Sequence, residues 1–114
     1  MVSKNLIAAS SKPLILAILR QGENYGYRII QSVKELSGGK LDWADGMLYP
    51  VLHRLQKEGL VSTKWKMSDG GRMRKYYRLT DKGHEALITE KEHWMTVHNI
   101  LQKLWQPEPS LDSI

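Results

Sequence analysis

Residues 64–78 carry six Lys and Arg side chains against a single acid, Asp69. Alternate side chains of a strand share a face, so a strand here would present Arg72, Arg74 and Tyr76 together. Cations interleaved with aromatic rings suit a polyanion such as a phosphate backbone, and the two glycines before this strand let backbone approach a phosphate closely. The alternative is a solvated hairpin whose charged edges discourage further strand pairing. The side chains predicted to bind phosphate here are Arg72, Arg74 and Lys75.

A second group of polar side chains that could bind nucleic acid lies on a predicted helix that ends at Gly59. Its leucines recur at helical spacing and define a buried face. Tyr49 and His53, four residues apart, share the neighbouring face beside Arg54, where their polar groups reach bases or phosphates. The alternative for Tyr49 is a half-buried core aromatic. The leucines of the buried face are Leu48, Leu52 and Leu55.

Other kinds of chemistry are excluded by composition and spacing. The chain has no cysteine, which excludes disulfides, thiolate metal sites and cysteine catalysis. Its four histidines show no metal-ligand spacing, and no Ser–His–acid arrangement, phosphate-cradling glycine loop or pair of catalytic carboxylates stands out. We therefore predict no enzyme activity, no metal and no cofactor.

The longest apolar run, residues 13–19, is far shorter than the ~20 residues that cross a bilayer. The N-terminus also lacks the layout of a signal peptide. We therefore expect a cytoplasmic protein without a membrane partner.

The charges are divided unevenly along the chain. Residues 1–83 carry 15 Lys and Arg against 7 Asp and Glu, whereas residues 84–114 carry 2 against 5, within a net charge of +5. A basic body with an acidic end predicts that one part meets a polyanion and the other meets protein. The alternative is a soluble protein with an accidental charge gradient.

Glycine and proline divide the first part of the chain into short helices. Pro13 suits the first position of a helix that ends at Gly22, preceded by a frayed or amphipathic lead-in over residues 1–11. Asn24 is expected to cap the second helix. Together with Tyr25 it would contact phosphate through the free amides of that helix end.

The third helix contains an unusual proline, Pro50. A proline in a helix interior costs about 3 kcal/mol or more, and it is tolerable only within about the first turn. The helix therefore either starts near Asp45 and Gly46 or is kinked. Its expected cap is Asp42 or Asp45.

The rest of the chain predicts a hairpin and one long helix. Residues 60–66 and 73–79 are rich in β-branched and aromatic residues, and the segment between them suits a turn. Thr80 or Asp81 then caps a helix over 81–105. At this length the chain fits one globular unit that is mainly α with a small β-hairpin, a winged helix-turn-helix plus a long C-terminal dimerisation helix. The predicted parts are a DNA-binding domain over 1–80, the dimerisation helix over 81–106 and a disordered tail over 107–114.

The long predicted helix carries apolar residues at heptad spacing. Leu87, Trp94 and Leu101 are seven residues apart, and Val97 and Leu104 fill intervening positions. Such a seam is typical of a helix that packs against a partner helix. A second copy would give a two-fold homodimer, which matches a palindromic DNA operator. The alternative, compatible on another face, is that this helix packs against the chain's own first helix.

Three segments resemble the signature blocks of PadR-family transcriptional regulators. These are "LILAILRQGENYGYRI", "GMLYPVLHRLQKEGLV" and "GGRMRKYYRLTDKG", and the resemblance covers roughly residues 13–83. It also accounts for Pro50, because the family tolerates a proline early in its recognition helix. The resemblance implies a winged-helix repressor that binds double-stranded DNA and dimerises through its C-terminal helix.

Within the family, the chain resembles the short subfamily that includes multidrug-responsive repressors of the LmrR type. That resemblance implies that Trp94 stacks on a planar aromatic small-molecule effector at the dimer interface, with Ala17 and His98 near the pocket. His98 stands where the LmrR type has an acid, so Glu90, one turn before the tryptophan, is the remaining partner for a cationic ligand. The alternatives are a regulator without an effector, in which Trp94 only packs, and a protein–protein adaptor on a winged-helix scaffold.

Overall fold

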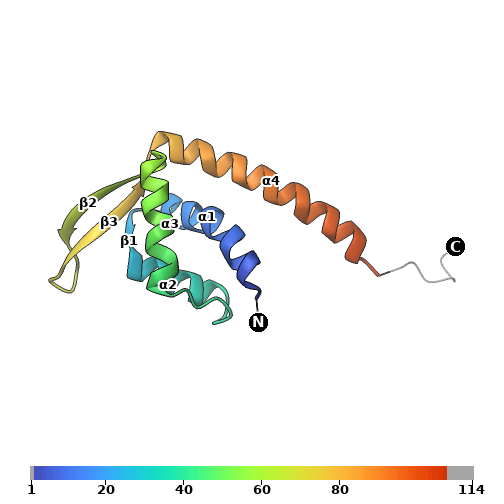
Figure 1. Cartoon of the computed structure of the whole chain (residues 1–114), viewed down its shortest axis with the longest axis horizontal. Helices are drawn as coiled ribbons and strands as arrows, with labels where there is room; N and C mark the ends of the chain where they lie inside the picture. Colours follow the sequence, from blue (N-terminus) through green and yellow to red (C-terminus); the bar gives the residue numbers. More distant parts are fainter. Residues whose placement is uncertain (1, 108–114) are drawn as a thin grey trace, which may run out of the picture.

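The computed structural model describes residues 2–107 and contains the predicted winged-helix architecture (Figure 1). Three helices lie to one side of a small antiparallel sheet, and a fourth, long helix leaves this body at its C-terminal end. The fold-class prediction is thereby confirmed, with one additional strand. Most of the predicted disordered tail, 107–114, lies outside the described residues. The elements in chain order are α1 (Lys4–Arg20), β1 (Asn24–Tyr25), α2 (Gly26–Leu36), α3 (Asp45–Lys57), β2 (Val61–Met67), β3 (Met73–Leu79) and α4 (Asp81–Trp105).

Helix α1 begins nine residues earlier than predicted, so Pro13 lies inside it rather than at its first position. The helix is started by Ser3, whose Oγ accepts a hydrogen bond of 3.2 Å from the Leu6 amide. Pro13 removes one backbone hydrogen bond but leaves the helix continuous. The prediction was wrong because a proline suited to a helix start can also sit inside a helix that tertiary packing stabilises. The apolar face of α1 buries Ile15, Leu16 and Leu19.

The sheet has three strands in the order β1-β3-β2, one more than the predicted hairpin. The added strand is Asn24–Tyr25, which pairs with Tyr77 and Tyr76 of β3. Asn24 was expected to cap α2, but Tyr25 is the capping residue, and it makes no side-chain hydrogen bond. Asn24 Oδ1 accepts instead from the Tyr25 amide at 3.0 Å. A two-residue strand has no sequence periodicity, so only its long-range pairing reveals it.

Helix α3 starts at Asp45, which is the first of the two arrangements expected for Pro50. The capping residue is Ala44, without a side-chain hydrogen bond, so neither Asp42 nor Asp45 caps the helix as predicted. Asp42 lies instead 3.8 Å from the Lys34 ammonium group. Pro50 falls in the second turn on the exposed side of the helix. The Gly46 carbonyl, which has lost its helical partner, is also at an exposed residue and can be hydrated.

One apolar core fixes α3 and the sheet relative to each other. Leu48, Leu52 and Leu55 of α3 are fully buried, as their spacing predicted. From the sheet, Tyr77 and Leu79 of β3 enter the same core. The outer face of α3 and the outer part of the hairpin are thereby held in fixed positions.

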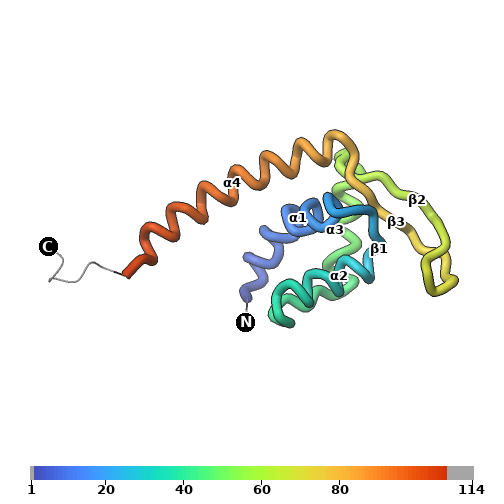
Figure 2. The backbone as a smooth tube through the Cα atoms, turned by 180° about the vertical axis from the view of Figure 1, so that it is seen from behind, coloured from blue at the N-terminus to red at the C-terminus, as the bar shows by residue number. Residues whose placement is uncertain are grey.

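Helix α4 is joined tightly to this body at its start and then projects away from it (Figure 2). Thr80 Oγ1 accepts from the Gly83 amide at 3.0 Å and donates to the Gly59 carbonyl at 2.6 Å. Gly83 is buried so closely against the Leu60 carbonyl that a Cβ atom there would overlap it. Leu87 packs on the body, and most later side chains of α4 are exposed. Among residues 2–107, no helix is both long enough and apolar enough to span a membrane.

Candidate nucleic-acid interface

The exposed face of α3 carries the polar residues that its sequence spacing placed there. His53 and Arg54 are exposed, whereas the leucine face is buried. Tyr49 is 44% exposed, so it is neither a core aromatic nor a free surface residue. An exposed helical face with an imidazole and a guanidinium is the kind of surface that enters a DNA major groove.

Tyr49 rests on the first residue of α2, Gly26. A Cβ atom at Gly26 would lie 2.6 Å from the Tyr49 hydroxyl and 2.8 Å from its ring. Only glycine therefore lets this tyrosine lie against the start of α2. Sequence reasoning named Tyr49 but missed Gly26, because no local signal connects two residues on different helices.

A cleft lies between these two helices and the wing, which we define as β2, β3 and the turn at 68–72. Its volume is about 340 Å³. Four predicted DNA-binding residues, Tyr25, Tyr49, Arg74 and Lys75, line it together. Arg72 lies apart from them in the turn, and Asn24 does not line the cleft. The complete lining is Tyr25, Gly26, Tyr49, Trp65, Met73, Arg74, Lys75 and Tyr77.

Cations and aromatic rings are stacked on the outer face of the sheet. The Arg74 guanidinium lies 4.4 Å from the centre of the Tyr25 ring, and Lys66 Nζ lies 4.4 Å from that of Tyr76. The two tyrosine rings meet edge to face at 5.3 Å. Arg74 Nε is buried and has no hydrogen-bond partner within residues 2–107. The stack therefore orients Arg74 while leaving part of its donor capacity free.

Lys66 also forms an ion pair with Glu23, the residue before β1. The hydrogen bond from Lys66 lowers the pKa of the Glu23 carboxyl, and the same bond raises the pKa of the Lys66 ammonium group. This pair ties the wing to the α1–β1 connection. No local pattern predicts this pair, because the partners are separated by 43 positions.

Lys75 lies on the other face of the wing, with its ammonium group 5.6 Å from the centre of the Tyr77 ring. Burial raises the pKa of the Tyr77 hydroxyl, and the neighbouring Tyr49 adds to this. Tyr77 is thus a neutral, buried support for the cation above it. The two faces of β3 divide as the alternation predicted, with Tyr77 and Leu79 pointing inward.

The helices of the helix-turn-helix start differently from α1 and α4. Ser3 and Thr80 cap α1 and α4 with their hydroxyl groups. Tyr25 and Ala44 precede α2 and α3 without any side-chain cap. The first-turn amides of α2 and α3 therefore keep hydrogen-bonding capacity that a phosphate oxygen can use.

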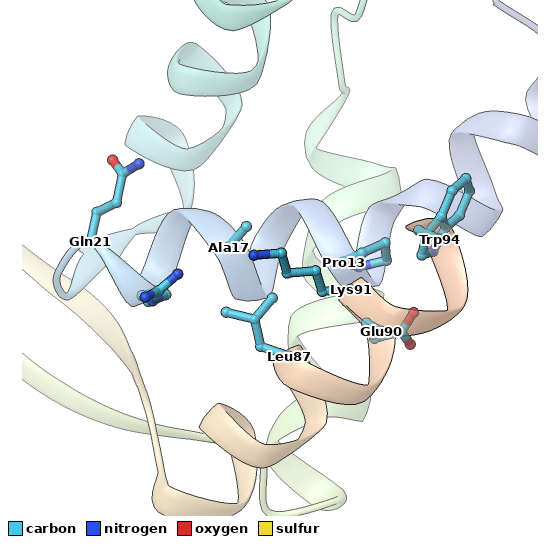
Figure 3. Close-up of a pocket in the computed structure, with 8 residues that line it drawn as sticks. Pro13, Ala17, Gln21, Leu87, Glu90, Lys91 and Trp94 are labelled. Atoms are coloured by element: carbon cyan, nitrogen blue, oxygen red, sulfur yellow. The ribbon is translucent and has the colours of Figure 1, made fainter. Parts of the chain in front are cut away.

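A second concave region lies between α1 and α4 (Figure 3). This α1–α4 groove has a volume of about 460 Å³ and brings together Ala17, Glu90 and Trp94. Glu90 lies 3.6 Å from Lys12, so its carboxylate already has a cationic neighbour. His98, predicted near the same pocket, does not line the groove. The other lining residues are Pro13, Arg20, Gln21, Leu87 and Lys91.

Trp94 also borders an apolar groove of about 430 Å³ on the side of the α1 N-terminus. Leu6 and Leu14 of α1 line it together with Leu41. Sequence reasoning missed this groove because it did not extend α1 back to Lys4. Trp94 therefore lines two grooves, the partly charged α1–α4 groove and this apolar groove.

The predicted seam residues of α4 have unequal environments. Leu87 packs against the body of its own chain, which is the alternative weighed for this helix. Val97 and Leu104 are 52% and 73% exposed. Trp94 and Leu101 are half-buried. Beyond Leu87 the helix thus presents apolar side chains that the chain itself leaves largely uncovered.

The three-helix body, the antiparallel sheet and the basic hairpin define a winged helix-turn-helix protein. Residues 15–89 match the model of the transcriptional regulator PadR-like family, and the chain belongs to this family. It is therefore a PadR-type transcriptional regulator with a DNA-binding fold, in a family of regulators rather than enzymes.

The chain is also similar to individual proteins and to a solved structure. The chain is 30% identical over 102 residues to "Uncharacterized protein X" of Lysinibacillus sphaericus, covering 89% of this chain and 93% of that protein. It is 32% identical over 87 residues to the negative transcriptional regulator PadR of Bacillus subtilis, covering 76% of this chain but only 46% of that protein. A crystal structure of a PadR-like transcriptional regulator from Bacillus cereus superimposes with a TM-score of 0.81 at 34% identity, covering 92% of this chain and 100% of that one.

Proposed function

We propose that this chain is a dimeric repressor that binds a palindromic DNA operator. Helix α3 would enter a major groove through Tyr49, His53 and Arg54, and the wing would reach the adjacent minor groove and backbone. The observation that carries the proposal is the cleft between α3 and the wing, because Tyr49 and Lys75 line it from opposite sides. The B. subtilis relative, a negative transcriptional regulator, supports repression as the outcome.

Cationic side chains of the wing would follow the phosphate backbone beside this cleft. Arg72 is exposed in the turn, and Arg74 is oriented by the Tyr25 ring. The first-turn amides of α2 and α3 would add further hydrogen bonds to phosphate. Asn24 and Tyr25, predicted to make such a contact, form β1 just before α2, and the Tyr25 amide already donates to Asn24 Oδ1. These contacts set affinity and register, whereas the exposed face of α3 would read base edges.

Dimerisation would occur through the second half of α4. Val97, Leu101 and Leu104, together with Trp94, would pack against the same residues of a second copy, while Leu87 stays largely within its own chain. Two-fold symmetry would place the two α3 helices about 34–36 Å apart, the repeat of successive major grooves. A small rotation at the seam would then weaken DNA binding.

The effector would be a planar aromatic molecule held at Trp94, as the resemblance to LmrR-type repressors implies. The tryptophan borders both grooves, and Ala17 and Glu90 share the partly charged one. Because Glu90 already faces Lys12, a cationic ligand would have to displace that pair. His98 would enter only if the dimer brings it toward the ligand.

DNA binding is tested with the double variant Arg72→Ala/Arg74→Ala in a fluorescence anisotropy titration of duplex DNA. The wild type should show a steep salt dependence, because about 6–10 phosphate contacts lose about 10³–10⁵ in affinity between 50 and 200 mM salt. The double variant should bind more weakly and with a shallower slope. Lys40→Ala/Lys103→Ala removes two exposed cations outside the wing and is the matched control. A salt-independent wild type, or a variant that binds equally well, would contradict the proposal and favour an adaptor.

The effector site is tested by tryptophan fluorescence of the wild type and Trp94→Ala, titrated with planar aromatic compounds. Four tryptophans contribute to the signal, so the difference between the two proteins is the quantity to read. Saturable quenching that disappears with Trp94→Ala is the expected result. If no compound quenches the wild type, Trp94 only packs and the regulator responds to another signal.

A further inference from the structure

The outer half of the wing exposes three large apolar side chains on one face. Trp65, Met67 and Met73 are 62%, 60% and 56% exposed. The strand register pairs Met67 with Met73, and Trp65 lies two residues before Met67, so all three point the same way. Toward the body, this same face carries the buried Tyr77 and Leu79. The three side chains thus continue an apolar face beyond the end of the core.

The turn that carries the two methionines is held closed by hydrogen bonds. The Ser68 amide donates to the Arg72 carbonyl at 2.8 Å, and the Ser68 hydroxyl donates to the same carbonyl at 3.0 Å. The Gly71 amide donates to the Ser68 carbonyl at 2.9 Å, and Gly71 has a φ of 78° that favours glycine. The paired methionines, at the end of β2 and the start of β3, therefore flank a defined turn, while their side chains keep the flexibility of thioethers.

The excess of positive charge in the wing indicates which kind of partner this apolar face binds. Lys66 and Arg74 are paired across the strands on the opposite face, and Arg72 follows in the turn. Asp69 is the single acid between residues 64 and 78. An apolar protein surface without acidic groups would leave these cations unpaired, whereas a DNA groove has apolar sugar walls between two lines of phosphates. Charge complementarity therefore assigns the face to DNA.

We infer that Met67 and Met73, with Trp65 behind them, form an apolar wedge that enters the minor groove, opens a base step and bends the duplex. This inference rests on the proposed function and extends it from binding DNA to deforming it. Apolar side chains inserted from the minor groove kink DNA by about 20–90° toward the major groove. The cations of the wing would bind the phosphates that line the opened minor groove. The wing would then prefer flexible steps such as TA or CA rather than a pattern of base-edge hydrogen bonds.

The test uses 30-base-pair duplexes that the wild-type protein selects from a random pool. Each duplex carries a fluorophore pair at its ends, so energy transfer reports bending, and permanganate oxidation reports thymines that have lost stacking. The variant is Met67→Gln/Met73→Gln, which keeps side-chain length on exposed positions. The control is Met95→Gln, at a methionine of α4 that is 44% exposed and lies outside the wing.

We expect the wild type and Met95→Gln to shorten the end-to-end distance and to expose one thymine in each half-site. The double variant should still bind the duplex but leave it straighter and its thymines protected. A double variant that binds with the same bend and the same permanganate pattern would overturn the wedge while leaving DNA binding intact. A wild-type protein that selects no duplex would instead refute the proposed function, and the wedge with it.

Discussion

The winged body and the second half of α4 differ in how far their apolar side chains are exposed to solvent. In the body, Leu48, Leu52 and Leu55 are fully buried. In α4, Leu104 and Trp105 are each 73% exposed although they belong to a helix of ordinary apolar content. The body therefore buries its apolar residues within one chain, whereas the second half of α4 leaves apolar side chains exposed, as expected of the proposed dimer surface.

Because of this difference in exposure, substitutions in the two regions should have different effects. A change in the body, or where α4 joins it, acts on folding of the single chain. If the proposed dimer forms, a change in the second half of α4 should leave the chain folded and act on dimerisation. The interface between α3 and the wing lies between these extremes, since it combines the buried Tyr77 with exposed side chains such as Trp65 and Met73.

The largest effect is expected from Gly83→Ala at the start of α4. The new Cβ would overlap the Leu60 carbonyl and lie 3.2 Å from Leu79, so backbone rather than a flexible side chain would have to move. We expect a loss of about 3 kcal/mol in the free energy of unfolding, at the upper end of overpacking effects. Urea unfolding followed by circular dichroism measures it. Gly46→Ala, with no atom within 4 Å of its Cβ, is the control and should be neutral or stabilising.

The next largest effect should come from Leu101→Asp in the proposed seam. A buried charge without a partner is costly, so dimerisation should weaken by more than about tenfold. The thermal transition of the winged body at low protein concentration should stay nearly unchanged. Sedimentation velocity gives the dimer constant, and Gln102→Asp, on the exposed neighbouring face, should leave it intact. If both substitutions weakened dimerisation equally, the proposed seam on α4 would be contradicted.

A smaller effect is expected from Gly26→Ala, beneath Tyr49. The new Cβ would meet the tyrosine side chain, which can turn away, so stability should change by less than about 1 kcal/mol. DNA affinity should fall by about tenfold, the scale of one lost base contact. In a double-mutant cycle, Gly26→Ala should add nothing once Tyr49→Ala is present. Additive losses would mean that the glycine acts on DNA binding by another route.

The smallest effect should come from Glu23→Gln, which removes the ion pair with Lys66. Because the folded protein lowers the pKa of the Glu23 carboxyl, this pair stabilises the fold above the unfolded pKa of about 4.3 and loses its effect as pH falls through the folded pKa. The melting temperature of the wild type should therefore slightly exceed that of the variant at pH 7. The two should converge as the pH falls below the lowered pKa of the folded Glu23 carboxyl. A difference that persists in acid would show that the glutamate acts by packing rather than charge.

Much of the fold was predictable because its signals are local. The leucine spacing of α3, the two strands of the wing and the Thr80 cap of α4 all depend on residues within a few positions of one another. The division of β3 into an inward face with Tyr77 and an outward face with Tyr76 followed from strand alternation. The start of α1 was missed because Pro13 has a second permitted place in a helix.

The sequence by itself determined which residues have the chemistry of this protein: the cations of the wing, the polar face of α3 and the apolar positions of α4. The tertiary structure alone decided their neighbours. It placed Arg74 on Tyr25, Tyr49 on Gly26 and Glu23 beside Lys66. Such contacts join residues far apart in the chain, and their geometry is fixed by close packing of the whole core rather than by the preference of any short segment.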